Sequence, residues 1–395
     1  MISNILTAKL HQPALPTKRV ERPRLVDKLN QGLVGGSQLT LISAPAGFGK
    51  TTCVCEWLIA LNLPSTWLSL DKSDDDPERF FAYLIAALQK INEFLGREVK
   101  DILQIGQLPP IETLTAAITN DLLQIHDKFL LVLDDFQVIQ DRVILEFIEK
   151  LINYHPPTLH LVIITREDPS LPLARLRAYQ QMTEIRVSDL RFSKDEVSDF
   201  LNNTMGLVLV EQDITGLENR TEGWVVGLQL AGLSIRGRED PSNFVASFNG
   251  SHRHILSYLI EEVLSRQPED IQVFLLQTSI LTRLSGDLCD TVTERTGCAD
   301  LLERLFNANL FLISLDDERH WYRYHQLFAD LLRNQQKRLP NHDTTELHRR
   351  ASRWYEQAGM IPEAIEHALA AEDYPATVAL LEQHVLGMIL QGYGK

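Results

Sequence analysis

A glycine-rich octapeptide constrains the fold of this chain more than any other feature. Residues Ala44–Thr51 (APAGFGKT) follow a short apolar run of strand length, Gln38–Ser43, and precede a helical pattern. Because Gly47 and Gly49 lack side chains, the backbone around them can turn its N–H groups inward around an anion. The spacing matches the phosphate-loop pattern G-x-x-x-x-G-K-[ST], except that Ala44 replaces the first glycine. Strand, loop and helix in this order predict an α/β nucleotide-binding domain.

The other side chains of this loop suit a nucleotide and its metal ion. The Lys50 ammonium can reach the β- and γ-phosphates, and the Thr51 hydroxyl can ligate Mg²⁺. The positive end of the helix that begins near Lys50 adds to the attraction for phosphate. We therefore expect the nucleotide to contact a run of consecutive residues: Ala46, Gly47, Phe48, Gly49, Lys50, Thr51 and Thr52. The alternative, a chance glycine-rich turn, does not explain why strand, motif and helix agree.

A second candidate element is an apolar strand that ends in two acids, Phe129–Asp135 (FLLVLDD). Asp134 would hold Mg²⁺, directly or through water, and Asp135 could orient or deprotonate an attacking water. An Asp-Asp pair after a strand can also be a helix cap. Its place downstream of a phosphate loop favours the nucleotide site.

Arg166 follows a further apolar run, Leu159–Thr165. Ligands of open parallel sheets lie at the carboxyl ends of the strands, so we expect Arg166 to sense the γ-phosphate. The alternative is a surface arginine that pairs with Glu167 or Asp168. Two other arginines, Arg175 and Arg177, could supply the cation instead, and the sequence does not separate them. The predicted catalytic set is Lys50, Asp134, Asp135 and Arg166.

The order of apolar runs and helical patterns predicts several domains. Runs of β-branched residues and leucine between helical patterns indicate a parallel sheet buried on both faces, in an α/β domain over residues 1–190. Strand signals then fade, and Ser193–Glu196 has the form of a capping box that opens a helical domain over 191–265. A strand-like pair, Leu310–Leu315 and His320–Tyr324, predicts a β-hairpin wing on a helical domain over 266–340. Paired helices with Gly and Pro breaks, over 341–395, suit the first units of a helical-repeat array.

The charge distribution excludes a broadly nucleic-acid-binding surface. The chain carries a net charge of −15, with 44% apolar and 23% charged residues, as in ordinary globular proteins. Residues 1–50 nevertheless carry seven basic and two acidic side chains, a net of +5. We expect Lys50 and Arg22 to meet the anion, and Lys9 and Lys28 to be solvated. Neither a secretory signal nor a membrane-spanning run is visible, so we expect a cytoplasmic protein with no membrane partner.

Two groups of residues resemble metal sites but favour structural interpretations. Cys53 and Cys55 face different sides of a helix, and the pair Cys289 and Cys298 has no histidine at metal-site spacing, so all four should be structural. The acidic stretch Asp71–Asp76 is expected to complement the N-terminus of the helix that begins at Pro77 rather than to bind a cation.

These motifs together resemble the N-terminal part of the MalT-like group of bacterial LuxR-family regulators, within the STAND class of signal-transducing P-loop ATPases. The resemblance covers essentially the whole chain. Besides the loop and the Asp pair, it is carried by Arg22–Leu25, Trp67–Asp71, Asp75–Pro77, Leu131–Phe136, Leu171–Arg177, Asp189–Ser193, Thr221–Trp224 and Tyr322–Phe328. It implies a nucleotide-binding domain, a helical domain, a winged-helix domain and a TPR-like helical-repeat sensor.

The resemblance also implies a switch and its ligands. ADP would be locked between the first and third domains at rest, and exchange for ATP would open the chain and allow self-association. Slow Mg²⁺-dependent ATP hydrolysis would reset it. His325 would contact the ADP β-phosphate, although it could also be a core histidine beside Tyr322 and Tyr324. Val20, Arg22 and Pro23 would flank the adenine, and Thr221–Trp224 would approach the base or ribose unless Trp224 is simply core.

Full-length members of this group end in a helix-turn-helix, and this sequence reaches Lys395 without one. Residues 271–330 carry five basic and nine acidic side chains, whereas a DNA reader needs a basic face. We therefore expect no DNA contact from this chain, and an unknown inducer read by the helical repeats. Two alternatives stay open: a nucleotide-dependent scaffold that does not hydrolyse, and a regulator that binds DNA directly.

Overall fold

The computed structural model describes residues 5–104, 108–238, 240–249, 252–338 and 344–390. The chain forms two compact units, which exchange short stretches of sequence. The N-terminal unit comprises Met1–Ile214 and Gly223–Gly232, and the C-terminal unit comprises Thr215–Glu222 and Leu233–Lys395. The chain therefore passes into the C-terminal unit for eight residues and then returns before it leaves for good.

The N-terminal unit is built on a five-stranded parallel sheet with strand order β2-β3-β4-β1-β5. In the register, Ser43 lies opposite Thr165 and Ser69 lies opposite Asp134, so the strand ends align at one edge. All residues of β1, β3 and β4 are buried, as continuous apolar runs predict. The expected parallel sheet is confirmed, with these strands: β1 Leu39–Ser43, β2 Ser65–Ser69, β3 Phe129–Asp134, β4 Leu159–Thr165 and β5 Met182–Ile185.

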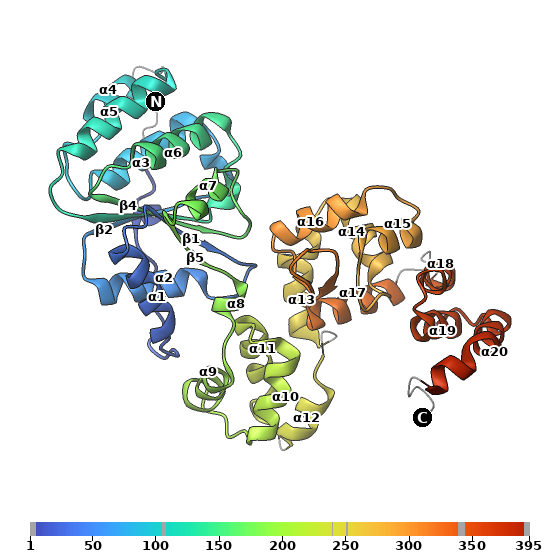
Figure 1. Ribbon diagram of the computed structural model, residues 1–395. Coiled ribbons are helices and arrows are strands. Elements are labelled where there is room, and N and C mark those ends of the chain that lie inside the picture. The colour runs from blue at the N-terminus through green and yellow to red at the C-terminus, as the bar shows by residue number, and fades with distance from the viewer. Residues whose placement is uncertain (1–4, 105–107, 239, 250–251, 339–343, 391–395) are drawn as a thin grey trace. The chain divides into compact units, whose positions relative to one another are not determined.

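Helices cover both faces of this sheet. Figure 1 shows α1 and α2 on one face, and α3 and α6 on the other. The helices around the sheet are α1 Pro23–Val34, α2 Lys50–Leu61, α3 Pro77–Leu88, α4 Arg97–Gln104, α5 Ile111–Leu123, α6 Arg142–Tyr154 and α7 Leu173–Ala178. Helix α1 was not predicted, because its Gly32 and the glycines that follow it give the segment the composition of a loop.

The expectation that Lys9 is solvated is wrong. Lys9 lies in the short 3-10 helix Thr7–Leu10, is 8% exposed, and pairs with Asp74 at 2.5 Å and Asp71 at 2.6 Å. Hydrogen bonds from Lys9 and Ser73 lower the pKa of Asp71 to about 2. Only part of the acidic stretch therefore caps the next helix.

Each acid of this stretch has its own partner. Asp76 caps α3 as expected, since its carboxylate accepts the N–H of Arg79. Asp74 is fully buried and accepts from the Arg79 side chain as well as from Lys9. Asp75 accepts two backbone N–H groups in the segment before α6. The acids thus hold the N-terminal segment and the turn before α6 against β2 and α3.

The capping box at Ser193 is confirmed. Ser193 accepts the N–H of Glu196, and Glu196 accepts the N–H of Ser193. The box opens α9 Lys194–Ser198, which continues as a π-helical turn, Asp199–Thr204, and is preceded by α8 Val187–Leu190. Helices α10 Glu211–Thr221 and α11 Val225–Ile235 each cross the division between the two units.

The C-terminal unit contains the predicted hairpin. Strands β6 Leu312–Ser314 and β7 Tyr322–Tyr324 pair antiparallel, and Leu284 extends the pairing through a bridge to Tyr322. The helices before the hairpin are α12 Pro241–Ser247, α13 Arg253–Glu262, α14 Glu269–Thr278, α15 Gly286–Thr293 and α16 Cys298–Asn307. Those after it are α17 Gln326–Arg338, α18 Thr344–Gln357, α19 Ile361–Ala370 and α20 Tyr374–Leu390. That α18–α20 begin a repeat array stays a prediction.

All four cysteines are buried thiols, which agrees with their expected structural role. Within the part of the chain that the structure describes, no helix has the length and apolarity that a membrane span requires.

Candidate functional site

The predicted phosphate loop lies at the carboxyl end of β1. Gly47 and Gly49 have φ angles of 81° and 78°, in the left-handed region that side chains disfavour. A Cβ on Gly49 would meet no atom within 4 Å, so only its backbone conformation requires glycine. A Cβ on Gly47 would lie 2.7–2.8 Å from Val226 and Trp224, so this glycine also allows close packing.

Lys50 occupies the loop. Its Nζ donates to the carbonyl oxygens of Ala44 at 2.7 Å and Pro45 at 2.9 Å. Burial, with the nearby positive charge of Arg166, lowers the pKa of Lys50 to about 8, against the opposing effect of two carboxylates at the end of β3. The structure thus brings Lys50 near all three other members of the predicted catalytic set.

Thr51 and Asp134 meet at the base of the loop. The Thr51 Oγ1 lies 3.4 Å and 3.3 Å from the two carboxylate oxygens of Asp134. Burial and the neighbouring Asp135 raise the pKa of Asp134 to about 6. Hydroxyl and carboxylate oxygens are the ligands that Mg²⁺ prefers, and Mg²⁺ commonly takes only one or two of them from protein beside substrate phosphates. The described residues contain no cluster of three His, Cys, Asp or Glu side chains suited to a metal ion.

Gln137, which the sequence did not single out, joins Asp135 to the end of β4. Its Nε2 donates to Asp135 Oδ1 at 2.8 Å, and its Oε1 accepts the backbone N–H of Arg166 at 3.0 Å. Asp135 has a φ of 58° and starts the 3-10 turn Phe136–Val138 that carries Gln137. Sequence position after an Asp-Asp pair gives no signal for this role, because the second partner comes from another strand.

Trp224 packs against the phosphate loop. Its side chain is fully buried, and its indole N–H donates to the carbonyl oxygen of Ala46 at 3.1 Å. The backbone N–H of Val226 donates to the carbonyl oxygen of Gly47 at 3.2 Å. Trp224 is therefore a core residue that also contacts the loop backbone. An approach of Thr221–Trp224 to the base or ribose stays a prediction.

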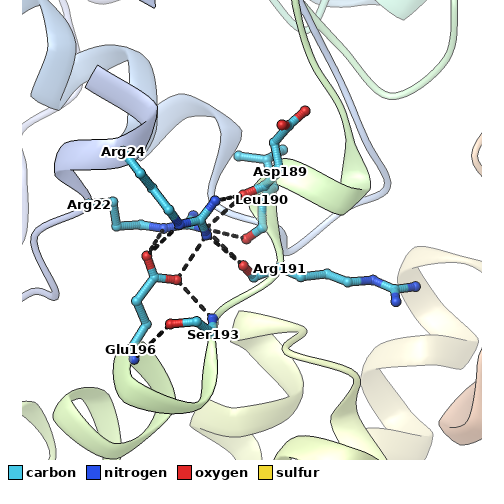
Figure 2. A network of polar contacts seen from close by, with 7 residues as sticks. All are labelled: Arg22, Arg24, Asp189, Leu190, Arg191, Ser193 and Glu196. Atoms are coloured by element: carbon cyan, nitrogen blue, oxygen red, sulfur yellow. Dashed lines mark hydrogen bonds and ion pairs between the residues drawn. The ribbon is translucent and has the colours of Figure 1, made fainter. Parts of the chain in front are cut away.

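The Arg22 side chain binds backbone carbonyl groups as well as a carboxylate. It is 6% exposed, and its Nη2 donates to the carbonyl oxygens of three successive residues, Asp189, Leu190 and Arg191, at 3.2, 2.7 and 3.1 Å (Figure 2). Burial lowers the pKa of Arg22 despite the attraction of Glu196. Its neighbour Val20 is buried, whereas Pro23 is exposed as the first residue of α1.

A second arginine reinforces this network. Arg24 donates to both carboxylate oxygens of Glu196, at 2.9 and 3.0 Å, and to the carbonyl oxygens of Asp189 and Arg191 (Figure 2). Lys28 adds an ion pair with Asp189 at 2.7 Å. The basic segment before β1 therefore binds the α8–α9 connection, and a contact of Val20, Arg22 or Pro23 with adenine stays a prediction.

The remaining candidate, His325, belongs to the C-terminal unit. It is 2% exposed, its Nε2 lies 2.9 Å from the Thr221 carbonyl oxygen, and its ring meets Phe311 edge-on at 5.6 Å. Beside it, the guanidinium of Arg323 donates to both carboxylate oxygens of Glu222, at 2.8 and 3.0 Å. Burial would raise the pKa of Glu222, but the Arg323 hydrogen bond and nearby positive charge lower it to about 2. His325 and the phosphate loop lie in different units, so a β-phosphate contact stays a prediction.

Comparison with known proteins identifies similar chains. Residues 260–344 match the family model of the MalT winged helix domain. The serine/threonine-protein kinase PknK of Mycobacterium tuberculosis is 32% identical over 380 residues, 95% of this chain and 34% of the kinase. The HTH-type transcriptional regulator MalT of Yersinia enterocolitica is 33% identical over 384 residues, 96% of this chain and 42% of the regulator. The chain thus spans about a third to two fifths of these relatives' lengths.

A solved structure shows the same fold. A Walker-type ATPase of Pyrococcus abyssi superposes with a TM-score of 0.56 at 16% identity, over 81% of this chain and 99% of the archaeal one. This similarity is one of fold, and it extends over most of this chain. The resemblance to the MalT-like group is therefore confirmed: the chain is similar to the regulator over nearly its whole length, and residues 260–344 match the MalT winged helix domain.

Proposed function

We propose that this chain is the nucleotide-operated switch of a MalT-like regulator. It binds ATP or ADP with Mg²⁺ and hydrolyses ATP slowly. The observation that carries the proposal is the convergence of Lys50, Thr51 and Asp134 at the carboxyl ends of β1 and β3. The similarity to a transcriptional regulator and to a protein kinase supports a regulatory role.

The residues fit the nucleotide and its ion. Gly47 and Gly49 add no side chains of their own to the loop, Lys50 would meet the phosphates, and Thr51 and Asp134 would hold Mg²⁺, which when bound neutralises charge on the phosphate oxygens. Lys50 must leave the carbonyl groups of Ala44 and Pro45 to do so. Its pKa of about 8 keeps it charged at neutral pH.

The same geometry assigns roles in hydrolysis. Asp135 orients the attacking water, and Gln137 fixes the direction of the Asp135 carboxylate through its hydrogen bond. Arg166 responds to the γ-phosphate from the end of β4. Hydrolysis is slow, because completing the site requires a change of domain arrangement or an oligomer.

The switch cycle follows the family expectation. ADP is locked at rest by His325 and by the residues flanking the adenine, and exchange for ATP releases the lock and permits self-association. The proposed switch has four functional parts: the nucleotide-binding domain 1–190, the helical domain 191–265, the winged-helix domain 266–340 and the start of the helical-repeat region 341–395. The inducer acts through the helices after residue 341, and we expect no DNA contact from this chain.

The proposal is tested by the nucleotide that co-purifies with the protein. We expect ADP at close to one per chain in the parent, and none in Lys50→Ala. Lys72→Ala, which removes an exposed lysine outside the loop, serves as the control and should retain ADP. Equal nucleotide binding by parent and Lys50→Ala would show that the site is elsewhere. Single-turnover phosphate release from ATP then separates a hydrolysing switch from a scaffold that only binds.

A further inference from the structure

We propose that Trp224 and Val226 position the phosphate loop from outside, and that the segment Thr221–Trp224 couples this loop to the hairpin of the winged-helix domain. This inference rests on the proposed function, because it concerns the loop as a nucleotide site. It assigns to the segment a mechanical role that its sequence does not reveal.

The first part follows from peptide geometry. Trp224 holds the carbonyl group of Ala46, and the N–H of Val226 holds the carbonyl group of Gly47. In a trans peptide the C=O and N–H groups point in opposite directions. The N–H groups of Gly47 and Phe48, which share these two peptides, therefore point away from Trp224 and Val226. These are backbone donors of the kind that a phosphate-binding loop offers to its anion.

The Trp224 indole is held rigidly enough to fix the direction of these backbone N–H groups. Trp224 is fully buried, and a Cβ on Gly227 would lie 2.6 Å from its ring. Gly223 has a φ of 69° and accepts the backbone N–H of Phe192 at 2.9 Å. A Cβ on Gly223 would lie 2.5 Å from the Phe192 carbonyl oxygen. The backbone on both sides of the indole, at Gly223 and Gly227, is therefore closely packed. A supporting group that cannot turn keeps the groups it contacts in a defined geometry.

The second part follows from what holds the other half of the segment. Glu222 has a φ of 50°, and its carboxylate accepts hydrogen bonds from Nη1 and Nη2 of Arg323 and from the backbone N–H of Gln326 at 3.1 Å. Thr221 offers its carbonyl group to His325. These partners all belong to the end of the hairpin and the start of α17.

Glu222 and Gly223 are consecutive, so one peptide bond separates the residue held by the hairpin from the residues held beside the loop. A shift of the loop on nucleotide binding moves Trp224, and this movement acts on the Glu222–Arg323 pair. Coupling of this kind acts in both directions, so if nucleotide binding changes the free energy of the Glu222–Arg323 pair, breaking the pair changes nucleotide affinity.

The positioning role is tested with the full chain and ADP. Trp224→Phe keeps a buried ring but removes the N–H donor, and we expect ADP affinity to fall about three- to tenfold. Trp67→Phe is the matched control: this buried indole donates to Ser69 within β2, and its loss should leave ADP affinity unchanged. If Trp224→Phe binds ADP with unchanged affinity while Lys50→Ala does not bind ADP, the positioning role is overturned but the proposed function is not. No ADP binding by the parent overturns both.

A second pair of variants examines the contact from the loop side. Gly47→Ala and Gly49→Ala impose similar backbone strain, but only Gly47→Ala drives a methyl group into Trp224 and Val226. We expect Gly47→Ala to lose at least about tenfold more ADP affinity, since the loop must leave its support. Equal losses in the two variants contradict the proposal, even if Trp224→Phe folds poorly.

The coupling is tested by a double-mutant cycle. Arg323→Gln breaks the pair with Glu222 without touching the loop, and we expect it to change ADP affinity about threefold or more. In a Trp224→Phe background this change should disappear, because the connection is already broken. The control is Arg319→Gln, an exposed arginine of the same hairpin, which should have no effect. An Arg323→Gln effect of equal size in both backgrounds overturns the coupling.

Discussion

The Thr51 hydroxyl lies 3.3 Å from a carboxylate oxygen of Asp134, at a place where burial already raises the pKa of that carboxyl to about 6. An acid whose pKa is raised by folding destabilises the folded protein as pH rises through that pKa. Asp134→Asn should therefore stabilise the nucleotide-free chain, by about 2–3 kcal/mol at pH 8 and by less at pH 5. Urea unfolding at both pH values measures this, and the variant should also lose Mg²⁺-dependent nucleotide binding. A stability gain independent of pH would contradict the assignment.

Lys50 should make nucleotide binding sensitive to alkaline pH. Its pKa in the free protein is about 8, because burial and Arg166 disfavour the ammonium, and only the ammonium attracts phosphate. ADP affinity should be nearly constant below pH 7 and fall by up to about tenfold per pH unit above pH 8. Calorimetric titration at several pH values tests this. In Lys50→Arg the residual affinity should lose this dependence, because arginine does not titrate in the range; an unchanged slope would assign the pH effect to another group.

Gln137→Met should separate hydrolysis from binding. Methionine preserves the length of the side chain but removes both hydrogen bonds, to Asp135 and to Arg166. We expect single-turnover phosphate release to slow by about tenfold or more, because a misplaced catalytic group costs rate, while ADP and ATP affinities stay within about twofold. Gln140→Met, an exposed glutamine at the end of the same segment, is the control. A parallel loss of binding and hydrolysis would indicate a merely structural role.

The two arginines of Figure 2 should differ in their effect on stability. Arg22→Met removes the arginine donor from the buried Leu190 carbonyl group, whereas Arg24 still reaches those of Asp189 and Arg191, and should cost about 1–3 kcal/mol. Arg24→Met removes a more exposed side chain and should cost about 1 kcal/mol or less. Denaturant unfolding followed by circular dichroism compares them. Similar costs would mean that the carbonyl groups of the α8–α9 connection find other donors.

His325→Ala should weaken ADP binding and leave ATP binding nearly intact, if this histidine is part of the resting lock. Competition of ADP and ATP for a fluorescent nucleotide analogue gives both affinities in one experiment. His320→Ala, which removes an exposed histidine from the same hairpin, is the control. Equal weakening of both nucleotides would assign His325 to the packing around Phe311 and Thr221 instead.

The sequence predicted those parts of the molecule that are specified by a short contiguous stretch of residues. The phosphate loop needs only two glycines, a lysine and a threonine between a strand and a helix, and these are contiguous. Strands β1, β3 and β4 are largely apolar and buried throughout, and the wing is two short strands joined by a turn. In each case the pattern that predicts the element lies within a short stretch of sequence, even where its partner strand is distant.

The sequence failed where the partner of a residue is distant. Lys9 looks like a surface lysine, yet it is buried because Asp71 and Asp74 approach it from the end of β2. The contact of Arg22 with the anion stays a prediction, but its carbonyl partners, which carry no sequence signal at all, were not predicted. Gln137 acquires its role only when β3 and β4 lie side by side. A single sequence records the side chain but not its tertiary partner.

The path of the chain between the two units has a consequence for how this protein can be divided. Because residues 215–222 belong to one unit and 223–232 to the other, no single cut yields two complete halves. A fragment that stops at 214 lacks Trp224 and Val226, and so lacks the support of its own phosphate loop. Genetic recombination would meet the same obstacle, and the segment would be inherited whole. The kinase and the regulator each match some 95% of this chain, so both similarities run through this segment.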